Sequence, residues 1–138
     1  MLFQRINAAL HMHGSGDIGT KPNQAHFGFN VKSPQPKGEL NYHHKATNAK
    51  IHGKVIHIFY TCDCSTRFRI ETKNHCEYDV TVTGNPEEKK DNIEFFSIDY
   101  VAGTGSGCAD EHNAGSPVKG KIKCSKHEDD DDCDEDDH

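Results

Sequence analysis

The stretch that decides the fold is IHGKVIHIFY, residues 51–60. Apolar side chains occur on both faces of the strand that this stretch predicts, with Val55, His57 and Phe59 on one face and Ile56, Ile58 and Tyr60 on the other. A strand that is apolar on both faces usually lies centrally, between two layers. The segment from Lys50 to Thr61 therefore predicts the central strand of an all-β domain.

Seven further segments show the period of two that is typical of strands with one buried face. They are residues 6–12, 25–31, 39–44, 67–70, 78–83, 93–101 and 117–124. A Pro-rich turn at residues 33–38 predicts a hairpin between the second and third of these segments. No window shows a helical stripe, and the glycine content also disfavours helices. We expect an antiparallel β-sandwich or jelly-roll-like domain of about eight strands.

The charge is distributed unevenly along the 138 residues, which carry a net charge of −6. Residues 127–138, HEDDDDCDEDDH, hold nine of the acidic groups and no Lys or Arg. We expect a β-sandwich-like domain at residues 1–125 and a disordered acidic tail at residues 126–138. Such a tail is either solubilising or an electrostatic docking arm, and its carboxylates also allow weak Ca²⁺ binding.

The domain itself is nearly neutral, which favours no nucleic-acid partner. No stretch approaches the roughly 20 apolar residues that a membrane span needs. The start, MLFQRINAAL, shows no signal peptide, because it lacks an apolar region of useful length. Either a leader is missing, or export takes another route, or the cysteines are reduced.

Six cysteines are available to strengthen a core in which only 33% of residues are apolar and Trp is absent, namely Cys62, Cys64, Cys76, Cys108, Cys124 and Cys133. An even number in a small, Gly-rich β-chain favours disulfides and an extracellular or cell-surface location. In a reducing compartment the same residues would indicate metal or redox chemistry.

The pairing of these cysteines is left open by the sequence. Cys62 and Cys64 project the same way from a strand, so each needs its own partner. Cys76 is the nearest candidate, and Cys108 with Cys124 would close the Gly-rich loop at residues 103–107. Cys133 is the candidate for a free or intermolecular thiol.

Eleven histidines make the chain histidine-rich. His11 and His13 lie two residues apart on one strand face, and four more histidines lie on neighbouring expected strands, namely His26, His43, His44 and His52. Such a set predicts either a Zn, Cu or Ni site or the solvent-facing side of a sheet. A metal site would need three or four of these ligands to converge.

Signs of catalysis are few, and no catalytic residue is assigned. Neither Gly14-Ser-Gly16 nor the Gly-rich loop lies at a strand-to-helix turn, as a hydrolase nucleophile or phosphate loop would require. The acidic residues Glu87, Glu88 and Asp91 suit a charged turn. A small hydrolase using Ser15 near His11, His13 and His26 remains an alternative.

Several short motifs occur in a recognisable order: His11–Ile18, Phe27-Gly-Phe-Asn-Val-Lys32, Gly38-Glu-Leu-Asn-Tyr42, Asn85-Pro-Glu-Glu with Phe95–Ile98, and Gly120-Lys-Ile122. In this order the chain resembles the post-COAP-type domains, a family of secreted bacterial β-domains without an established activity. The resemblance implies an extracellular β-sandwich-like module. Many of these domains carry a cysteine pair in the strands matching residues 39–53, where this chain has none, so no disulfide position is carried over.

We therefore expect a non-catalytic extracellular β-module with a structural, adhesive or assembly role, whose partner is a second copy, an extracellular protein or a surface. The alternatives are a metal-binding protein that uses the histidines and the acidic tail, and a small hydrolase.

Overall fold

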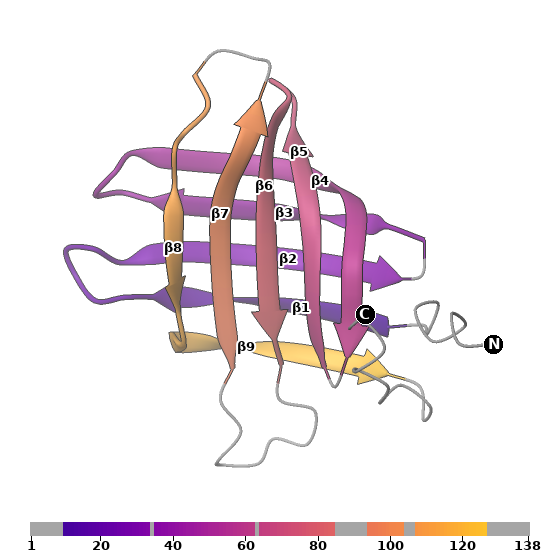
Figure 1. The fold of residues 1–138 in the computed structure, drawn as a ribbon. Helices are drawn as coiled ribbons and strands as arrows, with labels where there is room; N and C mark the ends of the chain where they lie inside the picture. The colour runs from indigo at the N-terminus through magenta and orange to yellow at the C-terminus, as the bar shows by residue number, and fades with distance from the viewer. Residues whose placement is uncertain (1–9, 34, 63, 85–93, 104–106, 127–138) are drawn as a thin grey trace.

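The structure is a computed structural model that describes residues 10–33, 35–62, 64–84, 94–103 and 107–126 (Figure 1). Within them the chain forms nine strands: β1 (Leu10–Ile18), β2 (Ala25–Ser33), β3 (Lys37–His44), β4 (Ala49–Cys62), β5 (Ser65–Thr72), β6 (Cys76–Thr83), β7 (Phe95–Gly103), β8 (His112–Gly115) and β9 (Pro117–Lys126). Consecutive strands from β1 to β8 pair antiparallel, and β9 pairs with β1. The strand order is β8-β7-β6-β5-β4-β3-β2-β1-β9. These residues contain no helix of the length and apolar character that crossing a membrane requires.

The single sheet curls over itself and so forms two layers. Figure 1 shows β1, β2, β3 and β9 running across the view in one layer, while β5, β6, β7 and β8 run down it in the other. Strand β4 bends and takes part in both layers. Its pairing with β5 is irregular between Val55 and His57 and again between Ile58 and Tyr60. Such bulges bend a strand and increase its twist, which suits a strand that turns from one layer into the other.

The central position predicted for this strand is confirmed, because β4 is the middle strand of the order. The prediction that both of its faces are covered was wrong. Ile56 and Phe59 are 43% and 40% exposed. The two bulges reset the alternation, so a regular period of two assigned the wrong faces to part of the segment.

The prediction of an all-β, antiparallel domain is confirmed, and the two layers come from one meandering sheet. Strand β8 was not predicted, because its four residues, HNAG, carry no apolar alternation. Strand β1 runs on through Gly14-Ser-Gly16, where no strand was predicted. The expected tail beyond Lys126, the loop acids Glu87, Glu88 and Asp91, the Asn85-Pro-Glu-Glu motif and Cys133 lie outside the described residues.

The glycines in β1 and β9 are explained by the close approach of the two strands. A Cβ atom at Gly16 would lie 2.2 Å from the Lys119 carbonyl oxygen, and one at Gly120 would lie 2.0 Å from the Ser15 carbonyl oxygen. Gly120 also has a φ of 97°, which other residues rarely adopt. The edge pairing that places β9 beside β1 therefore depends on glycine at both positions.

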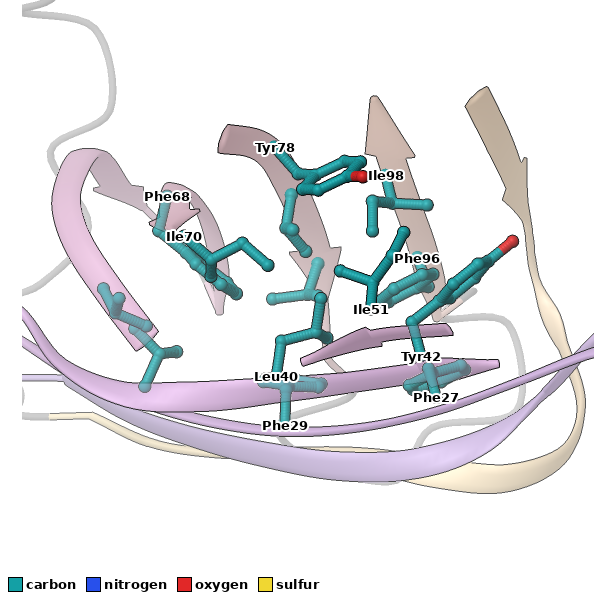
Figure 2. Close-up of a cluster of buried hydrophobic side chains, with 14 of the residues drawn as sticks. Phe27, Phe29, Leu40, Tyr42, Ile51, Phe68, Ile70, Tyr78, Phe96 and Ile98 are labelled. Atoms are coloured by element: carbon teal, nitrogen blue, oxygen red, sulfur yellow. The ribbon is translucent and has the colours of Figure 1, made fainter. Parts of the chain in front are cut away.

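The core lies between the inner faces of the two layers. Figure 2 shows the side chains of β2, β3 and β4 facing those of β5, β6 and β7, with Phe27, Phe29, Leu40, Tyr42 and Ile51 opposite Phe68, Ile70, Tyr78, Phe96 and Ile98. The Phe96 ring stacks on that of Phe27, with centroids 4.2 Å apart, and on that of Tyr42, with centroids 6.0 Å apart. Offset aromatic stacking of this kind adds to the free energy gained by burial. The core is thus centred on contacts between strands of different layers.

Two disulfides join segments that are distant in the sequence. Cys64, in the β4–β5 turn, is bonded to Cys124 of β9 across 60 residues. Cys76 of β6 is bonded to Cys108, which precedes β8, across 32 residues. The predicted disulfides are confirmed for these four cysteines, but the suggested Cys108–Cys124 bond and a bond from Cys76 to the Cys62–Cys64 pair were wrong. Sequence proximity misled here because the curl of the sheet brings β9 to the β4–β5 turn.

Removing the Cys64–Cys124 bond by C64A/C124A is expected to lower the free energy of unfolding by roughly 2–4 kcal/mol, because the unfolded chain regains the entropy of a long loop. Urea denaturation of the oxidised protein measures the change. The Cys76–Cys108 bond closes a shorter loop, so C76A/C108A is expected to lower the free energy of unfolding by slightly less. Peptide mapping without reductant checks the connectivity, and other pairings of these four cysteines would contradict it.

Candidate binding face

The outer face of the first layer carries most of the predicted site residues. Alternate residues of β9, β1, β2, β3 and β4 point away from the core, and their cross-strand registers arrange them in rows. The row at one side is Lys119, Asp17, His26, His43 and Lys50; the middle row is Lys121, Ser15, Gly28, Asn41 and His52; the next is Lys123, His13, Asn30, Glu39 and Lys54. His11 and Lys32 follow as a further cross-strand pair. We call this surface the histidine–lysine face.

The face carries a positive charge that is not neutralised locally. It bears six lysines, namely Lys32, Lys50, Lys54, Lys119, Lys121 and Lys123, and only two carboxylates. Both carboxylates are engaged by histidines: Asp17 accepts a hydrogen bond from His26 Nδ1, and Glu39 lies 3.2 Å from His52 Nε2. Within the described residues none of the ion pairs involves these six lysines. The ammonium groups are therefore available to an anionic partner.

Two hollows lie on this face, on either side of the boundary between Ser15 and Gly28. One, of about 560 Å³, lies over β2, β3 and β4 and is bordered by His26, His43 and His52. The other, of about 310 Å³, is bordered by His13, Lys121 and Lys123. The middle row contributes to both hollows, and its small members Ser15 and Gly28 are direct cross-strand neighbours.

Five of the six histidines proposed as metal ligands lie on the histidine–lysine face, namely His11, His13, His26, His43 and His52. The tightest pair is His11 and His13, whose ring centroids are 5.5 Å apart. Burial, Lys32 and His13 lower the pKa of His11. In the part of the chain that the structure describes, no group of three His, Cys, Asp or Glu side chains is placed to hold a metal ion.

His44, the sixth histidine, points instead into the molecule and binds a buried carboxylate. Its Nδ1 lies 2.6 Å from Glu111 Oε2, which also accepts a hydrogen bond of 2.5 Å from the Tyr42 hydroxyl. Thr47 Oγ1 donates to the second carboxylate oxygen over 3.0 Å. Asn113 Nδ2 completes the group by donating to the Tyr42 hydroxyl. His44 lies on the inner face because it follows Leu40 and Tyr42 at the strand period of two.

This cluster, which we call the Glu111 clasp, joins the two layers at one end of the sheet. Glu111 immediately precedes β8, whereas Tyr42 and His44 belong to β3 and Thr47 to the β3–β4 turn. Burial opposes the charge on Glu111, but the three hydrogen bonds outweigh it, and the pKa of this carboxyl lies below its ordinary value. Burial and Glu111 raise the pKa of Tyr42. The clasp could not be predicted from the sequence, because Glu111 lies among polar residues that show no periodic pattern.

The geometry gives the hydrolase alternative no support from the described residues. Ser15 is exposed, and its hydroxyl makes no hydrogen bond to a histidine in this part of the chain. The Glu111 carboxylate is itself almost fully buried and accepts hydrogen bonds from three donors. A nucleophile in contact with its base is the geometry that a hydrolase needs.

A further hollow, of about 680 Å³, lies where β4 and β5 approach the Cys76–Cys108 disulfide. Its lining mixes apolar Ile51 and Ile56 with charged Glu71 and Lys73. We assign no site to this hollow.

Comparison with known proteins adds no relative: no family model, no curated protein and no solved structure matches the chain. The resemblance to the post-COAP-type domains therefore remains a prediction.

The substitution E111Q is expected to lower the free energy of unfolding at pH 7 by about 2–3 kcal/mol, because an amide cannot accept all the hydrogen bonds that the buried carboxylate accepts. Since the folded pKa of Glu111 is lowered, its contribution is present above the ordinary value of 4.5 and is lost as the pH falls through the folded value. Urea unfolding curves of both proteins should therefore converge as the pH is lowered below 4.5.

The matched control is D110N, which removes a charge from the exposed neighbouring residue. It should leave the pH dependence of unfolding nearly unchanged, because the Asp110 side chain is exposed and its hydrogen bond goes to the exposed His112 ring. An E111Q protein as stable as the parent at pH 7 would contradict the role given to the clasp.

Proposed function

We propose that this protein is a non-catalytic extracellular β-module with an adhesive role, which attaches to anionic surfaces through its histidine–lysine face. The observation that carries the proposal is the set of six lysines on one sheet face that have no carboxylate partner among the described residues, where both acidic groups of the face are already bound by histidines. A cluster of positive charges on a surface attracts an anionic partner and increases the rate of association.

The scaffold supports a function outside the cell. Disulfides persist in oxidising compartments, and two of them join the described segments. They hold together a chain in which only 33% of residues are apolar. A binding face on a strand scaffold that is cross-linked in this way keeps its shape without the partner, which lowers the entropic cost of binding.

The proposal is tested by adhesion to carboxylated polystyrene beads at low ionic strength, with uncharged beads for comparison. We expect the full chain to adhere to the carboxylated beads despite its net charge of −6, because the face acts locally within a Debye length of about 10 Å or more. The variant K121E/K123E should adhere about tenfold less, because two attractive charges become repulsive.

The matched control is K45E/K73E, which changes the net charge by the same amount in the β3–β4 and β5–β6 turns, outside the rows that make up the face. It should adhere almost as the parent does. Equal losses in both variants would show that net charge alone governs adhesion, and that result would refute the assignment to this face.

A second candidate function, transition-metal binding, is favoured by the closeness of the His11 and His13 rings. Two histidines two residues apart on a strand project to the same side, as a shared ion requires. The environment that lowers the pKa of His11 favours its neutral ring, which is the form that binds a metal.

Isothermal titration with Ni²⁺, Cu²⁺ and Zn²⁺ tests the second candidate. H13N is expected to abolish any binding by this pair, because a single imidazole holds these ions weakly, whereas H75N on the other layer should not affect it. Binding that survives in H13N would exclude the pair as the site.

A further inference from the structure

We propose that the ligand of the histidine–lysine face is a linear acidic polysaccharide, of which one chain lies in a trough that crosses β9, β1, β2, β3 and β4 along the middle row. The inference rests on the proposed function and goes further, because it names the class of ligand and its path. It stands on the two hollows, on the cross-strand registers and on the unpaired lysines.

The dimensions of the trough suit a single polymer chain. Its two flanking rows are four residues apart along each strand, which is roughly 13 Å between backbone positions, and it spans five strands, which is roughly 19 Å. The side chains of the flanking rows narrow this space. Gly28 leaves the floor open, since a Cβ atom there would have only Ser15 Cβ at 3.8 Å and the Gly14 carbonyl oxygen at 4.0 Å.

The chemistry along the trough matches a polymer that carries both anionic and hydroxyl groups. Lysines stand at both of its ends, with Lys119, Lys121 and Lys123 on β9 and Lys50 and Lys54 on β4. Between them lie Ser15 and Asn41, whose side chains both donate and accept hydrogen bonds, as sugar hydroxyls do. Asp17 fixes the Nδ1 side of the His26 ring, which leaves Nε2 for a ligand.

A nucleic acid fits this face less well. The outward positions carry no Phe, Tyr or Trp on which a base could stack, and single-stranded nucleic acids are held largely by such stacking. They also carry no Arg, the residue that most often reads guanine or clamps phosphate. A flat anionic surface, in turn, would not enter the two hollows.

The inference is tested by a substitution that fills the trough and leaves every charge in place. In G28V the new methyl groups occupy the floor, and the backbone at this position does not require glycine. We expect isothermal titration with polygalacturonate and with chondroitin sulfate to show binding by the parent protein and at least about tenfold weaker binding by G28V. Neutral dextran should not bind.

Three controls separate this inference from the proposed function. S97V adds a similar apolar side chain to the outer face of the other layer and should bind as the parent does. Because the lysines of G28V are unchanged, we expect its polysaccharide binding to fall far more than its adhesion to carboxylated beads, which is measured alongside. If circular dichroism shows G28V to be misfolded, S15V fills the same trough from β1.

Two results would overturn the inference while leaving the proposed function intact. One is polysaccharide binding by folded G28V or S15V that equals binding by the parent. The other is binding of a single-stranded oligonucleotide, or of phosphatidylglycerol vesicles, as tight as that of polygalacturonate. Failure of the parent protein to adhere to the beads would instead refute the proposed function itself.

Discussion

The fold depends on β4 belonging to two layers at once. A sheet with one apolar face has to cover that face, and this chain has no helix in its described residues and no second sheet to cover it. Its solution is to bend the middle strand, 14 residues long, so that the two halves of one sheet pack on each other. The bulges after Val55 and Ile58 allow the bend, and the stacking of Phe96 on Phe27 follows from it.

A curled sheet of this kind leaves two strand edges that do not meet, and the chain joins its layers by other means. In the described residues β8 and β9 form the two ends of the strand order and share no ladder. The Cys64–Cys124 bond ties β9 to the far turn of β4, and the Glu111 clasp ties the start of β8 to β3. Covalent and buried polar links thus replace the backbone hydrogen bonds that would close a barrel.

The sequence predicts the alternation well and the connections between distant strands poorly. The period of two assigned Phe27, Leu40 and Tyr42 to the core, and it placed His11 and His13 on one face; both follow from the backbone alone. It failed at β4, where bulges shift the period, and at Glu111, whose partners lie more than 60 residues away. The cysteine partners were missed for the same reason, since no local rule reports how the sheet curls.

The positive charge of the histidine–lysine face was not predicted, because the net charge is a sum over all strands of the chain. Strands β1 to β4 and β9 contain eight lysines and two acidic residues, whereas β5 to β8 contain two arginines and four acidic residues. Lysines on an edge strand such as β9 also discourage edge-to-edge aggregation, and that explanation would suffice for Lys119, Lys121 and Lys123. It does not apply to Lys32, Lys50 and Lys54, which lie on strands paired on both sides. A face whose interior strands also carry unpaired cations is therefore better explained by an anionic ligand than by protection of the edge.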